Sequence, residues 1–457
     1  MSINHLPDEV LFEIFDYYLD PYHLREQYVW FSLTHVCRKW RAVMVASSFS
    51  LDLRIIVGPQ NPGHIETILS SPLQIPIFFD YKDTYGYMTD SSLWRLRAAL
   101  GHHDHVREVV FGGSTANFDK FFEVTKCVFP VLENLSLCGL NQKVPDTFLG
   151  GPDRSDLHLR RLKLSGFSLE STSRLLSSAT SLTDLFLDIN TVSLTPEISL
   201  LVCLQGLPHL RRLALSTLSC PLDPQPQPKT FKDEVSISKL THFRYAGNTV
   251  FLNAFMALLL APSLRDIKFW FIDRIWPHFF VHIPQVIKEI KEYYHAVKVE
   301  FQGRAFRLWL LTKSEYILHH KPHLELNFIL EYFPQKMEQV ADVLLMRFTV
   351  QEFVIHVNEF GVKHIPWHKL YQQFPRVKAL RTEGVNNTSV ARTLQHSCGD
   401  DDDFGHFGVL PALEEIDLGK SSLADESQRK SQLAAFELFV SARRRQVGRS
   451  VKVFFSP

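Results

Sequence analysis

The chain has 457 residues, of which 45% are hydrophobic and 21% charged, and its 49 Lys and Arg residues are matched by 49 Asp and Glu residues. This balance is typical of a globular chain with room for two or three domains or one repeat array, and it lacks the basic excess of a general nucleic-acid-binding protein. The longest apolar segment, 250–261, falls short of the ~20 residues that span a bilayer, and the acidic start of the chain argues against a secretory or mitochondrial leader.

The first predicted element is a helix that begins at Pro7. A proline suits the first helical position because its missing N–H would have no partner there, and Asp8 and Glu9 lie where the helix dipole favours negative charge. Apolar residues then recur on one face of this helix, and they are Val10, Leu11, Ile14, Phe15 and Tyr18.

A second amphipathic segment follows, in which Leu33, Val36, Cys37 and Trp40 share one face and Arg38, Lys39 and Arg41 lie largely off it. Together the two segments make a unit too small to bury much apolar surface by itself, because chains below ~60 residues are only marginally stable alone. The sequence therefore predicts that this unit needs a partner.

The two segments resemble an F-box: Leu6-Pro7-x-Glu9 with Ile14 and Leu19 is followed by Leu33-x-x-Val36-Cys37-Arg38-x-Trp40-Arg41. The resemblance implies a helical module that docks on the Skp adaptor, which in turn joins a cullin. The adaptor-binding residues that it implies are Leu6, Pro7, Glu9, Ile14, Leu33, Val36, Cys37 and Trp40. The connection between Leu19 and Leu33 is longer and more aromatic than is usual for the family, and the alternative is an ordinary helical hairpin that caps the following domain.

From about residue 51 a different pattern begins, in which a loose Leu-x-x-Leu-x-Leu template recurs. Successive first positions are 26, 27, 23, 28, 30 and 24 residues apart, close to the ~20–29 residues of a leucine-rich repeat. The matches are Val106/Val109/Phe111, Leu132/Leu135/Leu137, Leu159/Leu162/Leu164, Leu182/Leu185/Leu187, Leu210/Leu213/Leu215, Leu240/Phe243/Tyr245 and Leu264/Ile267/Phe269. An earlier strand is expected within 73–79, followed by a helix capped by Asp90.

Several units open with an apolar-Pro-x-Leu phrase, as at Phe129-Pro130 and Leu207-Pro208, where proline ends a helix and biases the chain toward an extended entry. Beyond residue 270 the pattern weakens, and 270–350 is either a set of degenerate repeats or a separate insertion. The period returns at Val377 and Leu413, and a final helix over 425–446 and a strand over 451–455 are expected to cap the array.

No motif for catalysis or for a cofactor is evident: a phosphate-binding loop, a zinc-protease helix and a nucleophile elbow are missing from the sequence. Gly112-Gly113-Ser114-Thr115 lacks the lysine of a phosphate loop and is interpreted as a turn. The histidine groups do not complete a metal site, and the six cysteines are scattered without a C-x-x-C pair, as in a reduced cytoplasmic or nuclear protein.

One face of the repeat strands is a candidate binding surface. If the fourth and sixth template positions point inward, the third, fifth and seventh line the concave side of the sheet. Charged residues and one tryptophan occupy these positions, with Asp184, Asp188 and Asp266 among them; the candidates for substrate binding are Arg161, Lys163, Arg212, Arg244, Lys268 and Trp270. The basic bias suggests an acidic or phosphorylated segment of a protein partner, and a solvated polar face is the alternative.

The sequence thus predicts an α/β protein with an N-terminal helical F-box at residues 1–50 and an irregular leucine-rich-repeat-like solenoid at 51–457, a layout that resembles a large fungal family. The function that the resemblance implies is the substrate-recognition subunit of a Skp-cullin-F-box ubiquitin ligase, without catalysis, cofactor or metal, and without a membrane or nucleic-acid partner. The alternatives are an adaptor-bound scaffold outside the ligase and an enzyme whose motif has diverged.

Overall fold

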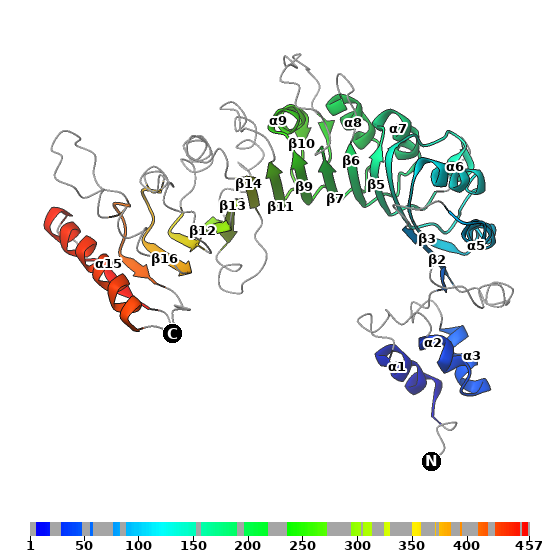
Figure 1. Cartoon of the computed structure of the whole chain (residues 1–457), viewed down its shortest axis with the longest axis horizontal. Helices are drawn as coiled ribbons and strands as arrows, with labels where there is room; N and C mark the ends of the chain where they lie inside the picture. The colour runs from blue at the N-terminus through cyan, green and yellow to red at the C-terminus, as the bar shows by residue number, and fades with distance from the viewer. Residues whose placement is uncertain are drawn as a thin grey trace. The chain divides into compact units, whose positions relative to one another are not determined.

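We describe a computed structural model of the chain (Figure 1). The described residues are 6–18, 29–47, 55–57, 76–82, 88–151, 157–189, 196–217, 235–271, 294–302, 305–312, 324–329, 350–357, 371, 374–384, 394, 410–418, 426–447 and 450–455. The chain divides into two compact units, Met1–Leu210 and Arg211–Pro457, and each is described by itself.

The first unit starts with three helices: α1 (Asp8–Tyr18), α2 (Val29–Thr34) and α3 (Arg38–Ala46). Helix α1 begins at Asp8, one residue later than the sequence predicts, because Pro7 precedes the helix and its carbonyl accepts the Leu11 amide at 3.1 Å. Its first turn carries Asp8 and Glu9, as expected. Helix α3 is capped by Cys37, whose Sγ accepts a hydrogen bond from the Trp40 amide at 3.4 Å. We call these three helices the helical module.

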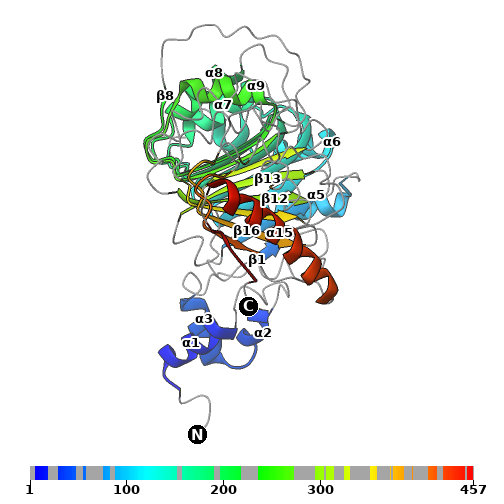
Figure 2. The same cartoon turned by 90° about the vertical axis from the view of Figure 1, so that its left-hand side faces the viewer.

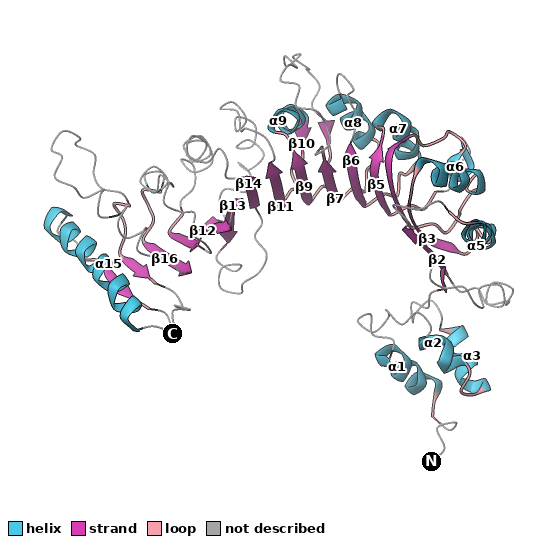
Figure 3. Ribbon diagram, in the orientation of Figure 1, coloured by secondary structure: helices cyan, strands magenta, loops and turns pink. Residues whose placement is uncertain are grey.

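The rest of the first unit alternates strands with helices (Figure 1). Its strands are parallel and follow chain order in the sheet: β1 (Ile55–Val57), β2 (Ile77–Lys82), β3 (Val106–Gly112), β4 (Asn134–Gln142), β5 (Arg161–Phe167) and β6 (Asp184–Ile189). Figures 2 and 3 show the helices gathered along one side of the strands: α5 (Asp90–Gly101), α6 (Thr115–Val124), α7 (Leu169–Ser178) and α8 (Pro196–Gln205). The cap of α5 is Thr89 rather than the expected Asp90, because the Thr89 hydroxyl accepts the Ser92 amide at 3.2 Å.

The core of this unit comes from the template positions. Leu135 of β4 lies in register with Leu162 of β5, which lies in register with Leu185 of β6, and all three are buried. The sixth positions, Leu137, Leu164 and Leu187, form a second buried row two residues further along. Equivalent side chains therefore stack on one another from repeat to repeat.

In the second unit the strands occur in the sheet order β7 (Arg212–Ser216), β9 (His242–Gly247), β11 (Asp266–Phe271), β14 (Leu324–Ile329), β13 (Ala305–Thr312), β12 (Tyr294–Gln302), β15 (Glu352–Val357), β16 (Ala379–Gly384), β17 (Glu415–Asp417) and β18 (Lys452–Phe454). A small second sheet pairs β8 (Val235–Ser236) with β10 (Leu259–Leu260). Its described helices of regular length are α9 (Thr249–Leu258) and α15 (Glu426–Val447).

The middle of this sheet departs from the repeat pattern. Strand β13 runs antiparallel to both of its neighbours, β12 and β14, whereas β14 pairs in parallel with β11 and β12 pairs in parallel with β15. The weak periodicity that the sequence shows beyond residue 270 therefore coincides with a short antiparallel meander inside an otherwise parallel sheet.

The end of the array contains the predicted helix, α15, and the predicted last strand, β18. The guanidinium of Arg443, buried on α15, donates from Nη2 to the carbonyls of Leu410 and Pro411 at 2.8 and 2.9 Å. These bonds tie the helix to the turn that precedes β17. The predicted fold class, an α/β repeat array after N-terminal helices, is confirmed, whereas the domain boundary at residue 50 stays a prediction.

Gly166 allows close approach of two strands, and its replacement is expected to destabilise the first unit. Its φ is 75°, and a Cβ there would lie 1.9 Å from the Gly139 carbonyl oxygen of the neighbouring strand. We expect Gly166→Ala to lower the free energy of unfolding by about 2 kcal/mol or more, measured by urea unfolding followed by circular dichroism.

The matched control is Gly101→Ala at the end of α5, where an added Cβ meets nothing within 4 Å. An equal loss of stability in both variants would contradict the role assigned to Gly166.

Candidate protein-binding surfaces

The helical module has a small core built from α1 and α3. Leu11 and Phe15 are buried on α1, and the Phe15 ring meets the Trp40 ring edge-on at a centroid distance of 5.0 Å. Trp40 is only 8% exposed, and Val43 and Met44 of the same helix are also buried. Trp40 is therefore a core residue of the module in the isolated chain.

Polar contacts fix the start of α1 against α3. The Lys39 ammonium donates a hydrogen bond to the Leu6 carbonyl and pairs with the Asp8 carboxylate at 3.2 Å. Arg41 Nε donates to the Thr34 carbonyl at 3.0 Å, which links α3 to the end of α2. The segment around Leu6 and Pro7 is thus held in place by the second predicted segment.

Apolar side chains that the core does not use remain on the surface of the module. Ile14 is 40% exposed and Val36 is 54% exposed, and Val10 and Tyr18 are also exposed on α1. Val10, Ile14 and Tyr18 follow one another at intervals of four, so they form one stripe of the helix. We call Val10, Ile14, Tyr18 and Val36 the N-terminal apolar surface.

The residues predicted to bind an adaptor differ in their exposure to solvent and fall into three groups. Pro7, Glu9, Ile14 and Val36 are exposed; Leu6, Leu33 and Cys37 are partly exposed; and Trp40 is buried. Their role in binding stays a prediction.

The second candidate surface is the sheet face that carries the third, fifth and seventh template positions, which we call the open face. In the first unit, Arg161 of β5 is exposed and pairs with Asp184 of β6 at 4.0 Å. The Lys163 ammonium lies 5.0 Å from the centroid of the Phe186 ring, and Ser165 donates to Asp188 at 2.8 Å. The predicted cations of this unit therefore already interact with their neighbours.

In the second unit, the open face holds the other four candidates. Arg212 and Arg244 are exposed on β7 and β9, and Lys268 and Trp270 lie on β11, where Trp270 is 48% exposed. Arg244 is in register with Lys268 on β11 and with Ala214 on β7. The structure brings Arg244, Lys268 and Trp270 together on adjacent strands, and their role in substrate binding stays a prediction.

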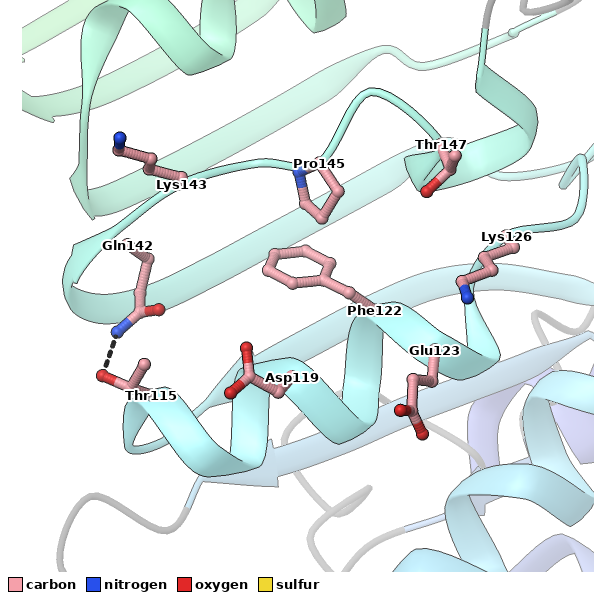
Figure 4. A pocket seen from close by; sticks show the side chains of 9 residues that line it. All are labelled: Thr115, Asp119, Phe122, Glu123, Lys126, Gln142, Lys143, Pro145 and Thr147. Atoms are coloured by element: carbon pink, nitrogen blue, oxygen red, sulfur yellow. Dashed lines mark hydrogen bonds between the residues drawn. The ribbon is translucent and has the colours of Figure 1, made fainter.

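A shallow cavity of about 490 Å³ lies between α6 and the segment that follows β4 (Figure 4). Phe122 points toward Pro145, and Gln142 Nε2 donates to the Thr115 hydroxyl at 2.8 Å. The remaining lining residues are charged or polar and of both signs, namely Asp119, Glu123, Lys126, Lys143 and Thr147. The sequence gives no sign of this cavity, because its walls come from neighbouring repeats and not from one motif.

Ser114 is the N-cap of α6, which agrees with the interpretation of Gly112-Gly113-Ser114-Thr115 as a turn. In the described ranges, no three His, Cys, Asp or Glu side chains gather as a group able to hold a metal ion. The same residues include no helix with the length and apolar character needed to traverse a bilayer.

Comparison with known proteins identifies the helical module. An F-box-like family model matches residues 3–49, so the chain contains an F-box-like domain at its N-terminus. No curated protein sequence matches the chain.

Among solved structures, a chain of the crystal structure of the TLR13-ssRNA13 complex matches with a TM-score of 0.30 and 13% identity. The alignment covers 80% of this chain and 52% of that one, so this chain spans about half of that neighbour's length.

The cysteines offer a test of the open face. Cys138 is exposed on β4 at a seventh template position, whereas burial raises the pKa of the Cys127 and Cys203 thiols. A raised pKa leaves less reactive thiolate at a given pH. In timed maleimide labelling at mildly alkaline pH, with peptide mass spectrometry, we expect Cys138 to react before the other two. Faster labelling of Cys127 or Cys203 would contradict the orientation assigned to β4.

Proposed function

We propose that this protein is the substrate-recognition subunit of a Skp-cullin-F-box ubiquitin ligase. The F-box-like domain at residues 3–49 supports binding to a Skp adaptor, and a repeat array beside such a domain supports presentation of a protein substrate. The layout also resembles that of a large fungal family of F-box proteins. Such a subunit works in the cytoplasm or nucleus.

The observation that carries the proposal is the N-terminal apolar surface. The side chains of Ile14 and Val36 are about half exposed although the core of the module has formed. Apolar side chains that stay exposed on one small domain favour an interaction site, because burial against a partner removes them from water. Their position inside the F-box-like domain supports a Skp adaptor as that partner.

In this role the protein performs no chemistry. It holds a substrate near the ligase and raises the effective concentration of the substrate's lysines. The rival role is that of a scaffold that binds the adaptor outside the ligase, and the presence of a cullin in the complex separates the two.

The double substitution Ile14→Ala and Val36→Ala is expected to abolish co-purification with a Skp adaptor. Apolar anchors at the centre of an interface typically cost ~2 kcal/mol or more each when truncated. Both side chains are substantially exposed, so the helical module should still fold. Co-expression followed by size-exclusion chromatography measures the amount of one-to-one complex.

The matched control is Leu140→Ala with Val202→Ala, which removes apolar side chains outside the F-box-like domain that are even more exposed, at 79% and 61%. The control should retain the complex. Adaptor binding that survives the Ile14 and Val36 changes would refute the assignment of this surface. Trp40→Ala is unsuitable for the purpose, because Trp40 is part of the core.

A second prediction distinguishes the ligase subunit from the scaffold. When the wild-type complex is mixed with purified cullin and its RING partner, we expect the cullin to co-elute with the adaptor and this protein. The double variant of Ile14 and Val36 should leave the cullin bound to adaptor alone. A wild-type complex that excludes the cullin would favour the scaffold role.

A further inference from the structure

Cations of one repeat face acids of the next at several places in the described sheets. Arg161 pairs with Asp184 at 4.0 Å, Arg381 pairs with Asp417 at 3.7 Å, and Lys378 pairs with Glu414 at 3.6 Å. In the first two pairs the residues are register partners on adjacent parallel strands. Opposite charges side by side stabilise a sheet, and like charges in the same positions destabilise it.

Arg244 departs from this arrangement. It occupies the fifth template position of its repeat, as Arg381 does, but its register partners are Lys268 on one side and Ala214 on the other. Among the residues that the structure describes, none forms an ion pair or hydrogen bond with the Arg244 side chain. Lys268 has the acidic Glu325 as its register partner on β14 and already has an interaction partner in the protein, so the exposed guanidinium of Arg244 is the cation of this neighbourhood that is open to an anion.

An apolar platform lies next to this cation. Trp270 follows Lys268 by two residues on the same face of β11, and its register partner on β9 is Ala246. Trp270 is 48% exposed, so about half of its apolar side chain is open to a partner. Arg and Trp are also the residue types most enriched at the energetic centres of protein interfaces.

The helix side of these strands is already filled, which leaves the open face for binding. The Phe243 ring packs against the rings of Phe255 on α9 and Phe269 on β11, with centroid distances of 5.6 and 5.7 Å. The Tyr245 ring stacks on the Phe251 ring at a centroid distance of 5.9 Å. Figure 1 shows α9 above β9 and β11. These contacts fix both strands, so Arg244, Lys268 and Trp270 are presented by a rigid support.

We propose that Arg244, Lys268 and Trp270 bind an extended protein segment that carries a carboxylate followed, two residues later, by an apolar side chain. Residues of an extended chain that are two apart are separated by about 6.6 Å, the same separation as the Lys268 and Trp270 positions along β11. The carboxylate then meets Arg244 and Lys268 while the apolar side chain covers Trp270. Lys268 already has an interaction partner in the protein, so a single carboxylate fits the site better than a doubly charged phosphate.

This inference rests on the proposed function, since it names the class of segment that the substrate receptor would hold. The two can fail separately. Adaptor binding depends on the N-terminal apolar surface, and peptide binding depends on the open face of the second unit.

The test is capture of the full-length chain on beads that carry the peptide Gly-Ser-Ser-Glu-Ser-Leu-Ser-Ser-Gly at increasing salt. Matched beads carry Gln or phosphoserine in place of Glu, or Ser in place of Leu. We expect the Glu-Ser-Leu peptide to capture wild type best and capture to fall with salt, because the contact includes a charge pair. Arg244→Gln and Trp270→Ala should each weaken capture about tenfold.

The matched control is Arg161→Gln, which removes an exposed arginine of the same sheet face that is already paired with Asp184. It should bind the peptide as wild type does. Four outcomes would each overturn the proposal. With wild type, they are no capture by the Glu-Ser-Leu beads, equal capture by the Gln-Ser-Leu beads, or stronger capture by the phosphoserine beads. The fourth is undiminished capture of Arg244→Gln. Co-purification of the adaptor with the same preparations reports separately on the proposed function.

Discussion

In-register parallel pairing between neighbouring strands is the constraint on which the repeat architecture depends. Because Leu135, Leu162 and Leu185 occupy equivalent positions, each buried side chain packs on its counterpart in the next repeat. The same register aligns the polar positions on the other face of the sheet. A charged side chain there lies beside the residue at the equivalent position of the next repeat. The sequence of one repeat thus sets the electrostatic environment of its neighbours: Arg381 has Asp417 as its register partner, whereas Arg244, at the same template position, has Lys268 and Ala214.

The helical module solves a different physical problem, that of folding with very few residues. Its core relies on the contact between Phe15 and Trp40 and on the bonds from Lys39 to the start of α1. A unit of this size cannot enclose all of its apolar side chains. Those left outside are arranged in a stripe, so the property that limits its stability also supplies its interaction surface.

The sequence predicted the fold well because the repeat period is visible in single residues such as Leu162 and Leu164. Other features arise between repeats and have no local pattern. The apolar face of α1 gave no indication that Leu11 and Phe15 would be enclosed while Ile14 stayed exposed, since both sets fit one amphipathic helix. Likewise, the ion pairs of the open face and the cavity beside Phe122 depend on strand neighbours, and the antiparallel direction of β13 is not encoded in its composition.

The direction of β13 has a topological consequence. Strands β12 and β13 add one strand in each direction, so β14 on one side and β15 on the other still point the same way. An even number of alternating strands leaves the polarity of the flanking sheet unchanged, and a repeat array can accept such an insertion without inverting the strands beyond it. The later repeats therefore keep their apolar rows inward, as the buried side chains of Phe353, Leu380 and Ile416 show.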